Sequence, residues 1–138
     1  MKTGYVCILD TTGHVRVHRN VKSTPEAFLE VVAPYREDLV VAAECRFTWY
    51  WLADVCAADG IGFVLGHALA MKAIHGGQAK NHKLDSCKIA SLLRGGLLPQ
   101  AYVDPAPMRS TRDLLRRRLH LVRKRGQLLA PIQNTRAP

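Results

Sequence analysis

The sequence contains no apolar run long enough to cross a membrane. A membrane-spanning helix needs roughly 20 consecutive apolar residues, and every uninterrupted apolar run in this chain is far shorter. The opening residues, Met1 to Tyr5, also lack the apolar core of a secretory signal peptide. We therefore expect a cytoplasmic protein without a membrane partner.

The cysteines form no closely spaced pair. Cys7, Cys45, Cys56 and Cys87 lie far apart, with no Cys-x-x-Cys motif. This spacing argues against a zinc ribbon and against a small disulfide framework, so we expect reduced thiols in or near the core. No internal repeat or low-complexity tract is present either, which argues against a solenoid.

Acidic residues are scarce in the second half of the chain. Residues 1–71 carry 6 basic and 8 acidic side chains, whereas residues 72–138 carry 14 basic and 3 acidic ones, a net charge of +11. This uneven distribution makes a polyanion the expected partner. Nucleic acid is favoured over a membrane surface because no amphipathic anchor or lipidation signal accompanies the charge.

The length and composition indicate one globular domain. A chain of 138 residues, 48% apolar and 22% charged, fits a single core. Residues 5–10 and 14–19 predict a β-hairpin around a turn. Ser23 to Glu26 predicts a helix start, and that helix should end near Pro34. Residues 38–44 are apolar on both faces, which is typical of a strand buried on both sides.

The middle of the chain alternates helices and strands. Apolar spacing and the glycines predict a helix over residues 47–58, a strand over 61–65, helices over 68–74 and 86–93, and a short strand over 100–103. A hairpin followed by this alternation is the order expected of an α/β ribonuclease H-like mixed sheet that lacks its first strand.

Residues 108–132 predict a long basic helix. Two rows of apolar residues recur every seven positions, Leu114, Leu121 and Leu128 in one and Leu115, Val122 and Leu129 in the other, which indicates a packing seam. Asp113 is the single anion among eight cations, so phosphate contact is favoured over a solvated basic face. The cations are Arg109, Arg112, Arg116, Arg117, Arg118, Arg123, Lys124 and Arg125.

Two carboxylates occupy positions where nucleases of this architecture hold divalent ions. Glu44 ends a predicted strand and Asp85 starts a predicted helix. Mg²⁺ prefers oxygen ligands, and two ions can stabilise the attacking and leaving oxygens of a phosphodiester. The alternative is structural: Asp85 would be a charge at a helix start and Glu44 a surface residue at a strand end.

Five segments of the chain, residues 38–51, 63–77, 79–86, 92–102 and 108–135, resemble a known family. They are similar to the N-terminal part of the bridge-RNA-guided insertion-sequence transposases, which carry a DEDD, RuvC-like domain. The most specific matches are the glutamate closing Val40 to Glu44, the Lys-Asn-x-x-x-Asp stretch ending at Asp85, and the basic run from Arg112 to Arg118 that leads to Ile132 and Thr135.

The resemblance supplies two of the four family carboxylates. Glu44 matches the second and Asp85 the fourth, whereas the third position is His82. The first lies in an opening strand that this chain lacks, and Asp10 cannot replace it because it resembles the far end of the following strand. His82 could still lie in the site, although imidazole suits Zn²⁺ or Mn²⁺ better than Mg²⁺; a solvated loop histidine is the alternative. His67 and His75 are expected at the surface or in loops.

The resemblance implies a truncated RuvC-like DEDD transposase domain over residues 1–105, followed over 106–138 by the start of a coiled-coil region. The missing strand would lie in the centre of the sheet, leaving Val6 and Val40 at unpaired edges. If about four of its side chains were buried at roughly 1.5 to 3 kcal/mol each, the loss would approach the whole stability of a typical domain, about 5 to 15 kcal/mol. We therefore expect a marginally stable fold.

The resemblance also implies DNA transposition, with DNA and a structured guide RNA as partners, Mg²⁺ or Mn²⁺ as cofactor and a nucleoid-associated location. Lys80 and Lys83 join the basic helix as expected nucleic-acid contacts. The helix seam is expected to join a second copy or an intact transposase. Because the first aspartate is absent and the third is His82, we expect a catalytically impaired fragment. The alternative is a non-enzymatic module that binds DNA or RNA through the basic helix.

Overall fold

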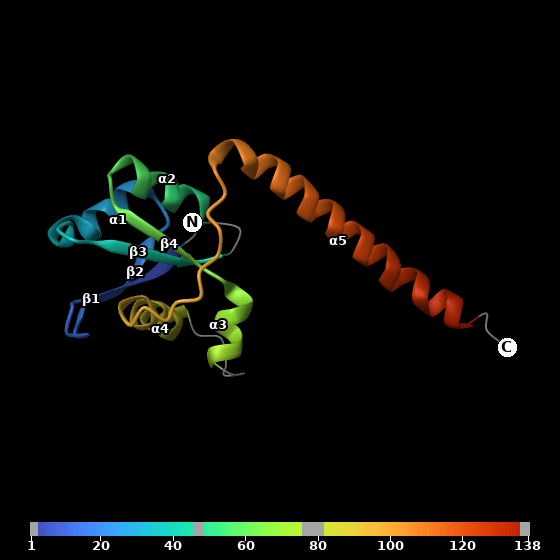
Figure 1. The fold of residues 1–138 in the computed structure, drawn as a ribbon, viewed down its shortest axis with the longest axis horizontal. Helices are drawn as coiled ribbons and strands as arrows, with labels where there is room; N and C mark the ends of the chain where they lie inside the picture. Colours follow the sequence, from blue (N-terminus) through green and yellow to red (C-terminus); the bar gives the residue numbers. More distant parts are fainter. Residues whose placement is uncertain (1–2, 46–48, 76–81, 136–138) are drawn as a thin grey trace. The chain divides into compact units, whose positions relative to one another are not determined.

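The computed structural model describes residues 3–45, 49–75 and 82–135. The chain forms two compact units, Met1–Tyr102 and Val103–Pro138. The first is a mixed α/β unit and the second is dominated by one long helix (Figure 1).

The first unit opens with the predicted hairpin. Strand β1 (Thr3–Leu9) pairs antiparallel with β2 (Val15–Lys22). Asp10 closes the turn, because its Oδ1 accepts hydrogen bonds from the backbone N–H groups of Thr12, at 3.0 Å, and His14, at 2.9 Å. Gly13 adopts a φ of 93°, which an L side chain rarely tolerates. The hairpin prediction is confirmed.

Helix α1 (Pro25–Val32) follows at once and is also as predicted. The Thr24 side chain accepts a hydrogen bond from the Ala27 N–H, and Pro25 occupies the first turn, where its missing N–H costs nothing. A short 3-10 turn, η1 (Ala33–Tyr35), ends the segment. The apolar face of α1 is buried through Phe28, Val31 and Val32.

Two parallel strands make up the second sheet. Strand β3 (Val40–Glu44) pairs in parallel with β4 (Gly62–Gly66), and α2 (Tyr50–Ala58) lies between them in the chain. Gly60, with a φ of 68°, reverses the chain after α2. Both strands were expected; the first residues of the helix predicted over 47–58 lie outside the described residues.

Helices α3 (Ala68–His75) and α4 (His82–Arg94) complete the first unit. His67 is exposed, as expected, and its Nδ1 accepts a hydrogen bond from the Ala70 N–H at 3.2 Å at the start of α3. The prediction of a strand over residues 100–103 is wrong. Only an isolated antiparallel bridge joins Gln100 to Gly66, with backbone hydrogen bonds from the Ala101 N–H to the Leu65 carbonyl and from the His67 N–H to the Pro99 carbonyl.

The strands do not form the single mixed sheet that was predicted. In the described part of the chain β1 pairs only with β2, and β3 only with β4, so there are two separate two-stranded sheets. The expectation that Val6 and Val40 face unpaired edges is confirmed. The burial of residues 38–44 on both sides is not, since the Val40 side chain is 49% exposed. Without a strand between β1 and β3, that edge of β3 is open.

Helices hold the two sheets in one unit. The core cluster joins Ile8 of β1 and Phe28, Val31 and Val32 of α1 to Cys56 of α2 and Ile61 before β4. On the other side of the strands, α4 contacts β1, β2 and β3 (Figure 1). The core is therefore built across the gap between the sheets.

The second unit consists mainly of α5 (Ala106–Thr135), a helix of 30 residues that is about 45 Å long at 1.5 Å per residue. The prediction of a helix over residues 108–132 is confirmed, and the observed helix is slightly longer at both ends. Every apolar residue of its seam is exposed, for example Leu121 at 61% and Leu128 at 71%. The seam therefore has no buried side chain among the described residues of the second unit.

Gly66 offers a test of the β3–β4 packing. A Cβ at this position would lie 2.8 Å from the Met71 Sδ and 3.3 Å from a Leu98 methyl carbon, and both neighbours are buried. We expect Gly66→Ala to lower the free energy of unfolding by about 1–3 kcal/mol. Gly62→Ala, on the same strand, would meet Val40 at an ordinary 3.6 Å and should cost nothing.

The measurement is the midpoint of urea unfolding for both variants at unchanged slope. Equal midpoints for Gly66→Ala and Gly62→Ala would contradict the close packing of β4 against Met71 and Leu98.

Candidate functional site

A groove of about 890 Å³ runs between the two sheets. Strand β1 lines it from Gly4 to Leu9, and β3 lines it over its whole length. Glu44, at the end of β3, lies in this lining, is half-buried and is paired in register with Gly66 of β4. One of the two predicted carboxylates therefore faces the gap between β1 and β3.

The second predicted carboxylate lies at the start of α4, one residue before a residue of the groove lining. Asp85 is half-buried in the first turn of α4, and the next residue, Ser86, lines the groove. A carboxylate in a first turn is also favoured by the helix dipole. The fold thus brings Glu44 and Ser86, the residue after Asp85, to one groove.

His18 of β2 fixes the start of α4. Its Nε2 donates a hydrogen bond to the Lys83 carbonyl at 2.9 Å and lies 3.3 Å from the Ser86 Oγ. The same carbonyl accepts a hydrogen bond from the Ser86 Oγ at 2.9 Å. Sequence reasoning missed this role, although the alternation of polar residues along 14–18 placed His18 on one face of a strand.

Two further contacts hold α4 along its length. In the middle, the Sγ atoms of Cys7 and Cys87 are 2.9 Å apart. At the end, Arg94 donates a hydrogen bond to the Thr11 carbonyl at 3.3 Å. Asp85 is consequently placed by a helix that is attached to the hairpin at its start, middle and end.

The Asp10 carboxylate stabilises the hairpin turn. Its Oδ1 accepts a hydrogen bond from the Thr12 hydroxyl at 2.6 Å, and its Oδ2 lies 2.9 Å from the Arg16 Nε. The hydrogen bond from the Thr12 side chain is the main cause that holds the pKa of the Asp10 carboxyl well below its usual range, with the His14 N–H and the Arg16 charge adding to it. The expectation that Asp10 lies by the turn is confirmed.

The predicted cations on α5 fall into two groups. Arg109 donates to the Asp104 carbonyl at 3.1 Å, and the Arg112 Nε lies 2.7 Å from the Asp104 carboxylate, with both side chains of this ion pair only 19% exposed. These two arginines fasten residues 103–105 to the helix start. Six cations remain exposed along the helix: Arg116, Arg117, Arg118, Arg123, Lys124 and Arg125.

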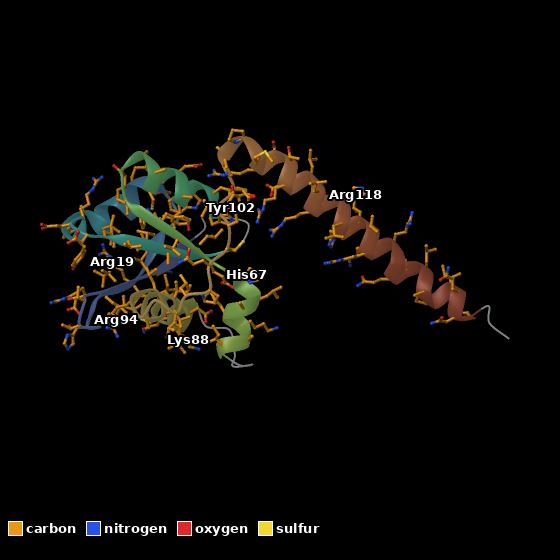
Figure 2. All side chains as sticks on the ribbon, viewed as in Figure 1. Arg19, His67, Lys88, Arg94, Tyr102 and Arg118 are labelled. Atoms are coloured by element: carbon orange, nitrogen blue, oxygen red, sulfur yellow. The ribbon has the colours of Figure 1, made fainter. Side chains whose placement is uncertain are left out.

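The exposed cations lie on different faces of α5. Successive residues are rotated by about 100°, so Arg118 and Arg125 fall between the two apolar rows, whereas Arg116 and Arg123 fall on the opposite side. Figure 2 shows the Arg118 side chain extending from the helix. Of the other predicted contacts, Lys83 is exposed on α4 and Lys80 lies outside the described residues.

Comparison with known families identifies the chain. Residues 2–135 match the family model of the DEDD transposase domain of the IS110 insertion sequences. The chain belongs to the IS110 transposase family. No curated protein and no solved structure matches it.

Family membership connects this transposase domain with DNA transposition and with DNA as a partner. DEDD transposases act with metal ions. In the ranges 3–45, 49–75 and 82–135, no helix is both long and apolar enough to cross a membrane.

The described side chains of the transposase domain do not fit a metal pair. Two ions need several oxygen ligands between them, and nowhere in the described part of the chain do three His, Cys, Asp or Glu side chains gather closely enough to hold even one ion. Glu44 and Asp85 are the available carboxylates. His82 is the first residue of α4, and its side chain is outside the described set.

The short distance between Cys7 and Cys87 predicts a specific disulfide. Burial, and then the hydrogen bond that the Cys7 thiol makes to Cys87, raise the pKa of the Cys7 thiol to about 12, so it stays protonated at neutral pH. We expect diamide to link Cys7 to Cys87, taking two electrons and two protons from the pair, and faster as the pH rises because the thiolate is the reactive form. Peptide mass spectrometry identifies the linked pair.

Cys7→Ser should abolish this disulfide, and Cys56→Ser should leave it unchanged, because Cys56 is fully buried in the core. A parent in which diamide links other cysteines, or leaves Cys7 and Cys87 unlinked, would contradict the packing of α4 on β1.

Proposed function

We propose that this chain is a transposase domain that binds nucleic acid through α5 and does not cleave DNA by itself. The observation that carries the proposal is the contrast between two sets of side chains. Six cations are exposed along α5, whereas the described part of the carboxylate site offers Glu44 and Asp85. Phosphate binding needs only the first set, and two-metal cleavage needs more than the second.

The binding face of α5 consists of Arg116, Arg117, Arg123 and Lys124. Lys80 and Lys83 are proposed as separate nucleic-acid contacts. The apolar rows enclose Arg118 and Arg125, so these two are placed closer to a partner helix than to a phosphate backbone. Contacts to phosphates carry little sequence information. Duplex DNA and a structured guide RNA are therefore both proposed ligands of this face.

A matched pair of double variants tests the binding face. We expect Arg116→Glu with Arg123→Glu to weaken binding strongly and to reduce the salt slope by about 2, since each phosphate contact contributes about 0.9. Arg118→Glu with Arg125→Glu has the same spacing and charge change but lies between the apolar rows, and should lower the slope by less. The measurement is DNA and RNA affinity by fluorescence anisotropy between about 50 and 200 mM salt.

Equal salt slopes for the two double variants would mean that overall charge, and no particular face of α5, determines binding. If the variant Arg116→Glu with Arg123→Glu has the same salt slope of affinity as the unmodified chain, α5 does not contact the nucleic acid.

A cleavage assay tests the other part of the proposed function. With Mg²⁺, this chain should nick supercoiled DNA no faster than the variant Glu44→Gln with Asp85→Asn, because the remaining carboxylates carry too little charge for two ions. His82→Asp alone should not restore nicking, since it adds one carboxylate where two are missing. Mg²⁺-dependent nicking by the unmodified chain that disappears in the double variant would contradict the proposal.

The seam of α5 predicts self-association, through a second copy of the chain or through an intact transposase. Leu114, Leu121 and Leu128 are each more than 60% exposed, and a heptad row of this kind buries its side chains against another helix. We expect the sedimentation coefficient to rise with protein concentration and Leu121→Asp with Leu128→Asp to sediment as a monomer. A folded parent that is monomeric at all concentrations would contradict this assembly.

A further inference from the structure

Two cysteine thiols face each other where α4 packs on β1. Cys7 lies in β1 and Cys87 in α4, 80 positions apart in the sequence, and their Sγ atoms are 2.9 Å apart. Both side chains are half-buried, and Cys7 also lines the groove between the sheets. Small molecules in solution can therefore reach this pair, whereas the fully buried Cys56 of α2 is closed to them.

Three elements hold the two sulfurs in place. Cys7 is paired in register with His18 of β2, and the His18 Nε2 lies 3.5 Å from the Cys87 Sγ. Helix α4 is attached to the hairpin on both sides of Cys87, through the Lys83 carbonyl before it and Arg94 after it. The close approach of the two sulfurs therefore follows from strand pairing and helix packing.

A disulfide fits this site with little movement. The two sulfurs of a disulfide are about 2.05 Å apart, so Cys7 and Cys87 have to approach by only about 0.9 Å from their present separation of 2.9 Å. Small rotations about the two Cα–Cβ bonds supply such a change. Oxidation should therefore leave α4 where it packs on β1, and its effect is on the strength of the attachment.

The attachment changes from weak to covalent on oxidation. In the dithiol form the middle of α4 is held by a thiol–thiol hydrogen bond, and a thiol is a weak donor and a weak acceptor. In the disulfide form the same point is a covalent bond between α4 and β1. That bond closes a loop containing β2, α1, β3, α2, β4 and α3. Closing a long loop restricts the unfolded chain, and the crosslink also opposes local detachment of α4 from the hairpin.

We propose that Cys7 and Cys87 form a reversible redox switch that crosslinks α4 to β1 when the chain meets a low-molecular-weight disulfide such as oxidised glutathione. Asp85 lies in the same helix, two residues before Cys87, so the crosslink also restricts movement of this candidate carboxylate. The switch acts within the first unit and does not depend on nucleic-acid binding by α5.

The reaction is two successive thiol–disulfide exchanges. One cysteine loses its proton and its sulfur attacks the small disulfide, whose S–S bond breaks and releases the first small thiol. The sulfur of the second cysteine then attacks the mixed disulfide, forms the Cys7–Cys87 bond and releases the second small thiol. Two electrons pass from the cysteine pair to the small disulfide, and the two protons end on the released thiols. An excess of the reduced small thiol reverses both steps.

A redox titration tests the switch. The full chain is equilibrated with oxidised and reduced glutathione at varied ratios, quenched by alkylation and analysed by peptide mass spectrometry. We expect one transition from the dithiol to the Cys7–Cys87 disulfide, and the same curve when the experiment starts from the oxidised chain. Cys45→Ser, which removes another half-buried thiol, should leave this curve unchanged. Cys87→Ser should lose the disulfide and retain at most glutathione bound to Cys7.

Hydrogen exchange and urea unfolding of the unmodified chain compare its two redox forms without any variant. In the oxidised form we expect a higher urea midpoint, and amide exchange in β1 and α4 slowed by about tenfold or more, with α5 as the unchanged internal reference. Reduction should restore both the midpoint and the exchange rates.

Three results would overturn the proposal. Oxidised glutathione that links other cysteines, or stops at a mixed disulfide in the unmodified chain, would show that the pair does not close. A Cys7–Cys87 disulfide that reduced glutathione does not open would be a permanent crosslink and not a switch. Equal midpoints and equal exchange rates in the two redox forms would show that the disulfide does not hold α4 on β1.

Discussion

The attachment of α4 across β1 and β3 is the interaction on which the first unit depends. The two sheets share no backbone ladder in the described residues, so helices alone connect them on this side. Three contacts fix α4 to the hairpin: His18 to the Lys83 carbonyl, Cys7 to Cys87, and Arg94 to the Thr11 carbonyl. The core of α1, α2 and the hairpin provides the connection on the other side of the strands.

This arrangement explains why the candidate carboxylates lie beside a groove. Glu44 is placed by the end of β3 and Asp85 by the first turn of α4. A strand between β1 and β3 would run past both positions. In its absence Glu44 lies at an open apolar groove, and the described part of the chain does not gather three ligands for a metal ion.

In the second unit, the apolar and the basic side chains of α5 lie on different sides of one helix. Helix α5 carries two apolar rows, with Arg118 and Arg125 between them and Arg116 and Arg123 opposite. Its apolar side chains are exposed along the whole helix, which a stable surface helix avoids unless a partner covers them. The opposite side keeps its cations available to phosphates. The proposed function therefore assigns assembly to one side of the helix and nucleic-acid binding to the other.

The sequence by itself determined the local elements, because their signals are short-range. The Thr24-Pro25 helix start, the turn at Asp10, the glycine after α2 and the heptads of α5 each act within a few residues, and the structure contains all of the elements they predict. The family resemblance likewise depends on the order of residues, and the family match over residues 2–135 bears out membership.

Only the tertiary structure decided how the strands pair and which polar groups serve the fold. Sequence periodicity predicted an apolar strand over residues 38–44. It did not predict which strands pair with it, because pairing depends on the neighbours that the fold brings together. In the described residues β3 pairs with β4 alone, so its other edge is open. The short strand over 100–103 was also not found: the segment meets β4 only around Gln100, through backbone hydrogen bonds of Pro99 and Ala101. The ion pair of Arg112 with Asp104 and the contact of His18 with α4 join elements whose approach is set by packing of the whole unit, which no local pattern encodes.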